Sequence, residues 1–257
     1  MTIAVERHDR VVLVEMRRPP HNYLNPALVE AVASALEEAA ADTTVGCAVL
    51  AGEGRSFCAG ADFGGNDSGE PQPQQGWSMT ERLYDAAARL CAIDIPWIAA
   101  VHGPAIGGGL GLAMTANLRV TCPEARFSAN FAALGIHQGF GLSVTLPDQV
   151  GPSRAALVLL SARRFRGDEA VELGLADRCV PAPELRAVAL ALAAEVAANA
   201  PLAVRAINRT LRAGLADRVR QATRHEAAEQ ARLAATADAA EGIAAVLERR
   251  PGQFTGR

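Results

Sequence analysis

The chain has 257 residues, of which 50% are apolar and 21% charged, and its formal net charge is −3 at pH 7. This composition is ordinary for a globular protein with one large core, and the charge gives no reason to expect nucleic acid or an anionic membrane as a partner. All 25 cationic residues are arginines. The absence of lysine excludes Schiff-base chemistry and a Walker-type phosphate site.

The five cysteines are widely spaced and mostly lie in apolar runs: Cys47, Cys58, Cys91, Cys122 and Cys179. No CxxC pair and no Cys/His cluster of metal-ligand spacing is present. We therefore expect reduced thiols, a cytoplasmic location and no metal site. Residues 1–10 are polar, unlike a signal peptide, and no apolar run reaches the length of a membrane span.

Strand and helix patterns alternate in the first part of the chain. Residues 3–16 alternate around the polar turn His8-Asp9-Arg10, which predicts a β-hairpin. Pro26 opens a predicted helix over 26–41, and the apolar run at 47–51 predicts a buried strand.

The alternation continues after a stretch rich in Gly, Pro, Gln and Asp at 64–78, which predicts a mobile loop. Helix, strand, helix and strand patterns then follow at 79–90, 95–101, 109–116 and 118–122. This order indicates an α/β fold with a mostly parallel sheet.

Beyond residue 153 we expect helices only. The spacing of Ala, Leu, Arg and Glu predicts them at 153–161, 168–173, 183–199, 201–213, 217–235 and 238–249. Asp238, with Glu241 three residues later, predicts a capping box for the last helix. These helices need a surface to pack against, either the core or a neighbouring subunit.

Two turns can bring a ligand close to the main chain. In the first, at 57–62, the small residues Ala59, Gly60 and Ala61 follow a buried strand. The alternative is a tight turn with Asp62 as a helix cap.

The second turn, at 107–111, holds three successive glycines between a strand and a helix. Free N–H groups at such a helix start attract a developing oxyanion. The alternative is a plain strand-to-helix turn. The glycines do not have the GxGxxG spacing of dinucleotide sites.

Taken together, the two turns resemble those of the crotonases, the enoyl-CoA hydratase/isomerase superfamily. Supporting segments run along the whole chain: RPPHNYLN at 18–25, AGAD at 59–62, PAIGGGLG at 104–111, ARF at 125–127, LGI at 134–136, GDEA at 167–170, GLAD at 174–177 and RP at 250–251. The resemblance implies an α/β spiral of ββα repeats over residues 1–195. It also implies a C-terminal helical region at 196–257 that assembles a homotrimer or a dimer of trimers.

The resemblance further implies the site residues. The N–H groups of Ala61 and Gly108 would form an oxyanion hole for an acyl-CoA thioester, with Gly107 beside them. The main chain at 59–62, including Ala59 and Asp62, and the loop around Arg18 and Leu24 would hold the adenine end of CoA. Phe254 would close that pocket across a subunit boundary. No cofactor is implied beyond the coenzyme A of the substrate.

The sequence departs from the family where hydratases carry two glutamates. Gly111 and Phe131 occupy those positions, and Gly139 stands near the place of an aspartate used by some isomerases. Loss of an acid/base group lowers a rate by roughly 10²–10⁴, so we expect poor hydration of simple 2-enoyl-CoA. Phe131, together with Trp77 and Phe140, would make the acyl pocket aromatic. The alternative for these three residues is ordinary core packing.

His137 is our candidate for a replacement acid/base group because an imidazole titrates near neutral pH. The alternative is a structural histidine. Asn130 and Gln138 could only position a water or a carbonyl, and Glu81 and Asp85 could act only if their helix lines the site.

Two hypotheses for the function therefore remain. The first is an enzyme that stabilises a thioester enolate for hydration, isomerisation or decarboxylation. The second is a catalytically impaired acyl-CoA-binding or regulatory protein. A purely structural oligomer is disfavoured by the run of glycines, and a serine hydrolase by the lack of a nucleophile elbow.

Overall fold

The computed structural model describes residues 2–62 and 77–257. Its main sheet has the strand order β1-β2-β3-β4-β6-β9, in which β1 and β2 are antiparallel and the other pairs are parallel. The strands of this sheet are β1 (Ile3–His8), β2 (Val11–Met16), β3 (Cys47–Gly52), β4 (Trp97–Val101), β6 (Leu118–Thr121) and β9 (Arg178–Cys179). The predicted hairpin, its turn at Asp9 (φ +56°) and the mostly parallel α/β sheet are confirmed.

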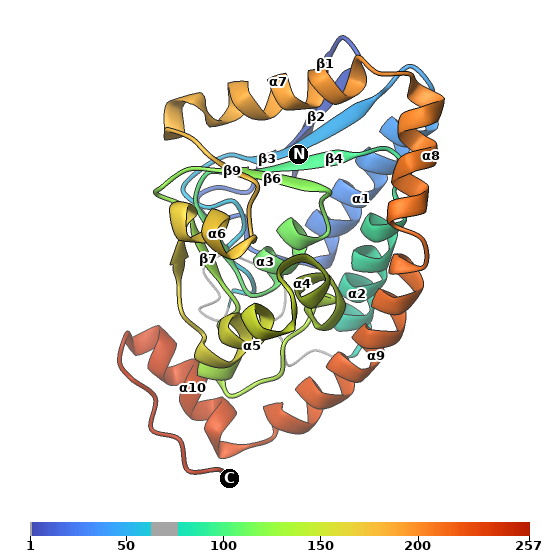
Figure 1. Ribbon diagram of the computed structural model, residues 1–257. Helices are drawn as coiled ribbons and strands as arrows, with labels where there is room; N and C mark the ends of the chain where they lie inside the picture. Colours follow the sequence, from blue (N-terminus) through green and yellow to red (C-terminus); the bar gives the residue numbers. More distant parts are fainter. Residues whose placement is uncertain (1, 63–76) are drawn as a thin grey trace.

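Two layers of apolar contacts cover the main sheet. Alternate residues of β2 face opposite sides: Val12 and Val14 join one buried cluster, and Val11 and Leu13 join the other. Helix α7 (Leu185–Ala197) lies across one face, and α1 (Pro26–Ala41) and α3 (Gly108–Met114) lie below the other (Figure 1). Burial on both faces explains why the strands are almost uniformly apolar.

A small second sheet lies on the side of α3. It consists of β5 (Pro104–Ile106), β7 (Arg126–Ser128) and β8 (Phe165–Arg166). The expectation that no strand follows residue 153 is wrong, because β8 and β9 lie beyond it. Each has only two residues, which is too short for a period of two to be visible in the sequence.

The predicted helices are present, with small shifts of their ends. Asn25 caps α1, its Oδ1 accepting the N–H of Leu28 at 2.9 Å. The other helices are α2 (Trp77–Ala92), α4 (Leu142–Val150), α5 (Pro152–Ser161), α6 (Gly167–Leu173), α8 (Pro201–Leu211), α9 (Leu215–Ala234) and α10 (Ala237–Glu248), with short 3₁₀ turns at Ala132–Leu134 and Ala182–Glu184. The loop predicted at 64–78 lies outside the described residues up to 76, and its last two residues belong to α2.

The capping box predicted for the last helix is wrong. Thr236 caps α10, its Oγ1 accepting the N–H of Ala239 at 3.1 Å. Asp238 instead accepts the N–H groups of Thr255 and Gly256 at 2.7 and 2.8 Å, and Glu241 binds Arg250. These carboxylates therefore hold the C-terminal tail along the helix.

Helix α8 carries an inward polar face. Arg205 donates to the carbonyls of Ala40, Asp42 and Val45 and pairs with Asp94 at 2.7 Å. Asn208 donates to the carbonyls of Ile93 and Asp94, and Arg212 to those of Leu90, Cys91 and Thr115. The three side chains thus satisfy main-chain oxygens at the C-terminal ends of α1, α2 and α3.

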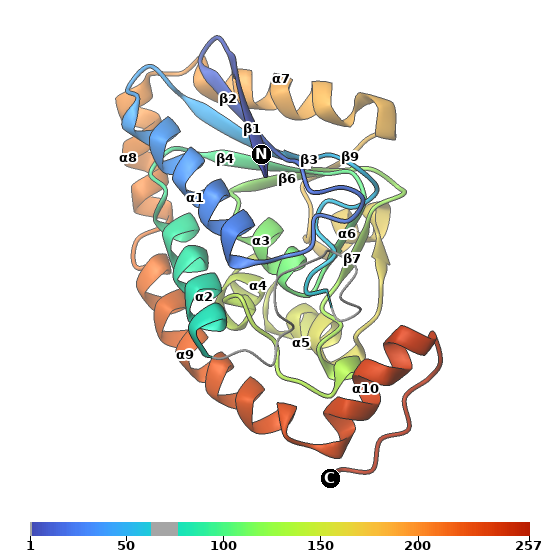
Figure 2. The same cartoon turned by 180° about the vertical axis from the view of Figure 1, so that it is seen from behind.

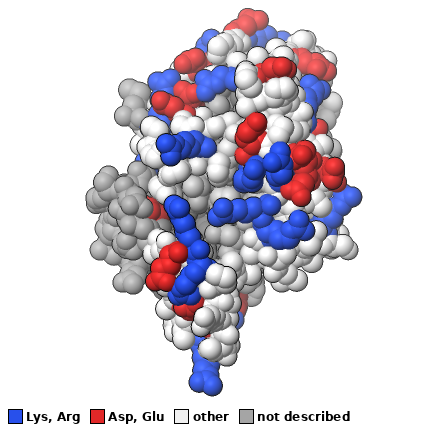
Figure 3. Space-filling view, turned by 90° about the vertical axis from the view of Figure 1, so that its left-hand side faces the viewer, with Lys and Arg blue, Asp and Glu red and all other residues white. Residues whose placement is uncertain are grey.

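The opposite face of α8 is apolar and exposed, with Leu202 and Leu211 exposed by 77 and 79%. From behind, Figure 2 shows α1, α2 and α9 side by side, joined by the pairs Arg89–Glu37 and Tyr84–Gln230. Arginine and acidic side chains are interspersed on the face shown in Figure 3.

Within the described residues, no single helix has both the length and the apolar composition of a membrane span. One pair of segments, Ala182–Ala197 and Pro201–Ala234, meets those criteria only when joined, and the two are bent by 105°.

Candidate functional site

Three segments far apart in the sequence meet beside α3. The turn after β3 pairs with β5, because the N–H of Cys58 donates to Pro104 O and the N–H of Ile106 donates to Cys58 O, both at 3.0 Å. The N–H of Leu24 donates to Gly60 O at 2.8 Å, so the loop before α1 lies on the same turn. The first and second turns identified in the sequence are therefore neighbours in the fold.

Close packing of the two turns explains their small residues. A Cβ on Gly60, which has φ +78°, would lie 2.6 Å from Ile106 O and 3.9 Å from Gly108 N. Any side chain there would push the turns apart. Gly60 thus brings the main chain preceding Ala61 to the start of α3.

Within the described residues, the N–H groups of Ala61 and Gly108 donate no hydrogen bond. Ala61 is exposed and Gly108 is half-buried, so both can be reached from outside. The amide of Gly107, in contrast, donates to Ser128 O at 2.8 Å, and this leaves Gly107 to shape the turn.

The loop that contains Arg18 and Leu24 is fixed by a buried amide. Asn22 is fully buried, its Oδ1 accepts the N–H of Arg18, and its Nδ2 donates to the carbonyls of Glu53 and Ser56 at 2.8 and 2.9 Å. The side chain of Leu24 covers the start of α3, since a Cβ on Gly108 would lie 2.5 Å from Leu24 Cδ2. Arg18 and Leu24 therefore lie beside the paired turns.

Cys58, at the centre of the site, is not a nucleophile. Its side chain is fully buried, and burial raises the pKa of the thiol to about 12. The backbone of Gly60 and then the positive charge of Arg18 lower this pKa, but burial is the larger effect. A thiol of this kind is almost wholly protonated near neutral pH and therefore unreactive.

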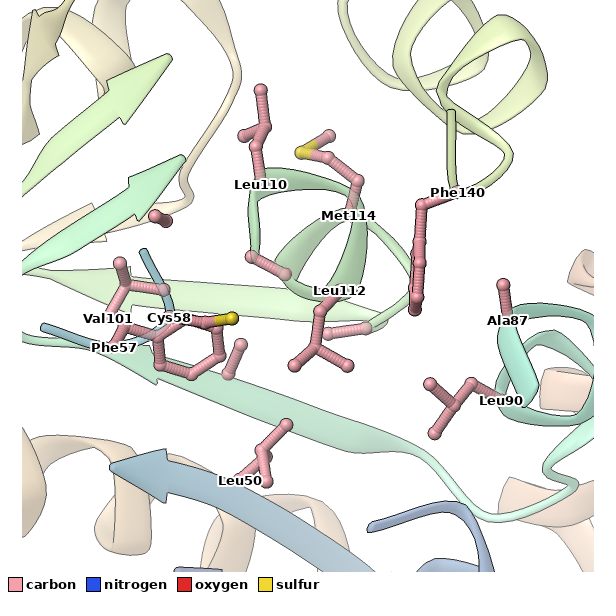
Figure 4. Packing of buried hydrophobic residues seen from close by; sticks show 14 of the residues in the cluster. Leu50, Phe57, Cys58, Ala87, Leu90, Val101, Leu110, Leu112, Met114 and Phe140 are labelled. Carbon is pink, nitrogen blue, oxygen red and sulfur yellow. The ribbon is translucent and has the colours of Figure 1, made fainter. Parts of the chain in front are cut away.

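Aromatic rings pack against the glycines at the start of α3. A Cβ on Gly111 would lie 2.7 Å from the Cβ of Phe140, whose ring stands against α3 (Figure 4). The ring of Phe131 lies beside Gly107, its Cζ 3.7 Å from where a Cβ there would be. Both phenylalanines are almost fully buried. This side of α3 is therefore apolar.

Phe140 has a strained backbone. Its φ of +60° is left-handed, and Gly141 follows at +76°. A bulky L-residue in this region costs roughly 1–2 kcal/mol. The hydroxyl of Tyr84 packs against Gly139, 2.2 Å from where a Cβ there would lie, and the buried carboxylate of Glu226 accepts the N–H of Gly141 at 2.9 Å. Burial, and then the charge of Glu226, raise the pKa of Tyr84.

Tyr84 and Glu226 were not identified from the sequence. Glu226 lies among polar and charged residues of α9 and therefore resembles an exposed helix position, whereas Tyr84 lies between Leu83 and Asp85 in α2, where nothing marks it as part of a site. Only packing shows that their side chains point inward.

His137 faces α9. Its ring meets that of His225 edge to face at 5.6 Å, and its Nδ1 lies 2.8 Å from Gln138 O, which fixes a proton on Nδ1. Gln230 donates to its carbonyl at 2.9 Å. Nε2 is the nitrogen left to exchange a proton, and the acid/base assignment of His137 stays a prediction.

The remaining predicted site residues lie apart or at the edge. Phe254 lies on the C-terminal tail beside α10 and is 47% exposed. Asp62 is half-buried at the end of the first described stretch, and the side chain of Trp77 lies outside the described residues. Among the residues described, no group of three or more His, Cys, Asp or Glu side chains is placed to hold a metal ion.

Comparison with known proteins agrees with this architecture. Residues 6–257 match the family described as Enoyl-CoA hydratase/isomerase. The chain is 35% identical to the 2,3-dehydroadipyl-CoA hydratase of Escherichia coli, over 99% of each chain. It is 33% identical to a probable enoyl-CoA hydratase of Mycobacterium bovis, over 100% of this chain and 98% of the relative.

Solved structures give the same result. An enoyl-CoA hydratase/isomerase from Pseudoalteromonas atlantica superimposes with a TM-score of 0.85 at 29% identity, covering 99% of this chain and all of the other. An enoyl-CoA hydratase from Mycobacterium avium subsp. paratuberculosis gives 0.85 at 26% identity, covering 99% of each chain. The fold is that of the crotonases. The chain belongs to the enoyl-CoA hydratase/isomerase family of this superfamily.

Proposed function

We propose that the chain binds an acyl-CoA thioester between the turn at 58–62 and the start of α3, with the N–H groups of Ala61 and Gly108 on the carbonyl oxygen. The observation that carries this proposal is the contact between the two turns, with Gly60 in left-handed conformation next to Gly108 N. Both amides lack an internal acceptor within the described residues. Family membership supplies the ligand class.

The adenine end of CoA is assigned to the loop around Arg18 and Leu24 and to the main chain from Ala59 to Asp62. The hydrogen bond from Ala59 N to His21 O at 3.0 Å supports this assignment because it ties the loop to the turn. Arg18 supplies a cation for a phosphate group. Phe254, on the exposed tail, would come from a second copy of the chain.

The reaction we propose proceeds through a thioester enolate. A preorganised main-chain donor at an oxyanion typically lowers a barrier by about 3–4 kcal/mol. Hydration also needs acid/base groups, which Gly111 and Phe131 cannot supply. We therefore propose isomerase or lyase chemistry on acyl-CoA, with slow hydration and with His137 as the candidate proton carrier.

Calorimetry can test the oxyanion hole directly. Butyryl-CoA is compared with its S-butyl thioether analogue, which has the same chain but lacks the carbonyl oxygen. Two hydrogen bonds to that oxygen contribute about 1–3 kcal/mol in total, so the thioester should bind roughly 5- to 150-fold more tightly. Equal affinities would refute the proposed hole while leaving CoA binding intact.

A catalytically impaired acyl-CoA-binding or regulatory protein is the second candidate. The ring of Phe140 against Gly111 favours it, because that ring takes the space of an acid/base side chain. Turnover is assayed with enoyl-, dienoyl- and malonyl-type CoA thioesters, with and without His137→Ala. Tight binding without turnover would support the binder, and turnover that depends on His137 would support the enzyme.

The assembly and location are also proposals. We propose residues 1–195 as the core and 196–257 as the trimerisation region of a homotrimer or dimer of trimers. The exposed leucines of α8 support an interface there. Light scattering after gel filtration measures the mass, and a monomer would exclude this assembly. The five free cysteines support a cytoplasmic location.

A further inference from the structure

The segment 137–143 is held in an unusual way. Phe140 and Gly141 both have left-handed backbones, with φ of +60° and +76°. For phenylalanine this conformation is an outlier that persists only where its surroundings enforce it, and such outliers cluster at functional sites. The ring it carries is 1% exposed and stands against α3 at Gly111.

A single carboxylate from α9 fixes this segment. Glu226 has no exposed surface, its Oε2 accepts the N–H of Gly141 at 2.9 Å, and its Oε1 accepts the N–H of Ser143 at 3.0 Å. Gly141 offers no side chain to cap α4, so Glu226 supplies the cap from a distant part of the chain.

Two further side chains reinforce the same segment. Tyr84 Oη donates to Gln230 Oε1 at 2.7 Å, and Gln230 Nε2 donates to His137 O at 2.9 Å. Side chains of α9 therefore bind the segment on both sides of Phe140, at His137 and at Gly141, and α2 supports them through Tyr84.

A buried carboxylate is a costly choice for this task. Over the described part of the chain, no cation lies within ion-pair distance of Glu226, so backbone donors alone compensate its burial. A neutral side chain could cap a helix at lower cost. A charged acceptor makes stronger hydrogen bonds than a neutral one, as expected where the position of the preceding ring, that of Phe140, must be exact.

The ring also has a defined place relative to the proposed ligand. Gly108 and Gly111 are three residues apart on α3 and share one face of the helix, about 4.5 Å apart along its axis. An acyl group that starts at Gly108 and follows α3 meets the ring of Phe140 after a length of roughly four carbons.

We propose that Phe140 sets the length of the acyl group accepted, favouring short apolar acyl-CoA thioesters, and that Glu226 is the positioning residue that holds Phe140 in place. This assignment rests on the proposed function, which puts the thioester carbonyl at Gly108.

Calorimetry with free CoA, butyryl-CoA and octanoyl-CoA tests it. The wild-type protein should prefer butyryl-CoA to octanoyl-CoA by on the order of tenfold or more, and Phe140→Ala should abolish this preference. Glu226→Gln, which keeps one acceptor oxygen, should shift the preference in the same direction. Its affinity for free CoA should stay within about twofold of wild type, because a loss of fold would weaken every ligand alike.

Control variants separate positioning from general stability. Asp217→Asn removes an exposed carboxylate from the same helix and should leave the preference unchanged. Phe140→Leu keeps a large apolar side chain and should retain part of the preference if Phe140→Ala does not fold. In a Phe140→Gly background, Glu226→Gln should cause no further shift in the chain-length preference. The ring that Glu226 positions is absent from that background, and glycine adopts φ +60° without strain.

The outcomes are distinct. Binding with a chain-length preference that neither Phe140 nor Glu226 alters would overturn the assignment alone. Absence of binding by the wild type to all three ligands would refute the proposed function and this assignment with it.

Discussion

Gly111 packs so closely against Phe140 that a side chain in place of the glycine would overlap the phenylalanine: a Cβ added to Gly111 would lie 2.7 Å from the Cβ of Phe140. That hydratases of the family carry a glutamate at the position of Gly111 is a prediction from the resemblance. The structure adds that an adjacent ring, held in a strained backbone conformation, fills the space that a side chain there would need.

This relationship predicts how hydration could be restored. In the triple variant Gly111→Glu, Phe131→Glu, Phe140→Gly, both carboxylates are present and the ring is removed, while glycine tolerates the φ of +60°. Hydration of crotonyl-CoA, followed as loss of the enoyl absorbance, should rise by at least about 10²-fold.

The double variant Gly111→Glu, Phe131→Glu, which retains Phe140, is the matched control. The glutamate side chain introduced in place of Gly111 must displace the ring, which costs about 1–3 kcal/mol of stability. This variant should therefore show a lower Tm and little hydration. Equal activity of the double and triple variants would show that the ring does not obstruct the site.

The sequence was sufficient to predict the helices and strands that are long enough to show a hydrophobic periodicity. The apolar runs of β2, β3 and β4 and the amphipathic helices from α5 to α10 lie where expected, and the two turns of the site follow the predicted strands. Family resemblance supplied the roles of Ala61 and Gly108, which remain proposals.

The remaining features depend on contacts between distant residues. Asp238 and Glu241 have the spacing of a capping box, but Thr236 caps the helix and the tail takes both carboxylates. Glu226 lies in a charged helix, so its burial could not be inferred from its neighbours. The obstruction of Gly111 by Phe140 joins two elements whose packing is not encoded in either segment alone.

The inward polar face of α8 should be important for stability. Arg205→Ala removes the donor to three main-chain carbonyls, of which that of Val45 is buried, and the closer of the two arginine partners of Asp94, so the free energy of unfolding in urea should fall by about 2–4 kcal/mol. Arg209 pairs with the same Asp94 but is 58% exposed. Arg209→Ala should therefore cost less than about 1 kcal/mol. Similar losses for both variants would contradict the assigned role of the buried arginine.

Alkaline pH should destabilise the fold through its buried thiols. Burial raises the pKa of Cys47 and Cys58 to about 12 and that of Cys91 to about 11, from an ordinary value of 9.0. Above pH 9 the unfolded chain loses these protons while the folded chain keeps them. The unfolded state then binds fewer protons, so the free energy of unfolding falls as pH rises from about 9 toward 11–12.

The measurement is unusually clean because the chain has no lysine to titrate in this range. Urea unfolding between pH 8 and 10.5 should show a decline that grows with pH, to at most about 1.4 kcal/mol per pH unit for each fully ionised thiol. Cys47→Ala should make the decline less steep, whereas a decline unchanged in that variant would exclude this thiol as a cause.

The C-terminal tail should detach when Asp238 is changed. Two hydrogen bonds from Thr255 and Gly256 lower the pKa of Asp238, and the Arg250 guanidinium, followed by the Gln253 amide, lowers that of Glu241 to about 2. Asp238→Asn removes the charge that draws both tail amides, so hydrogen exchange at residues 253–256 should become about tenfold faster. In the wild type, acid should lower the protection of the same amides, measured against the intrinsic exchange rate at the same pH. Both carboxylates are ionised and bind the tail fully above their ordinary pKa values. The contribution of Glu241 is lost as pH falls through its pKa of about 2, and that of Asp238 as pH falls through its lowered pKa. Exchange at the tail that is unchanged by both treatments would mean that other contacts keep it against α10.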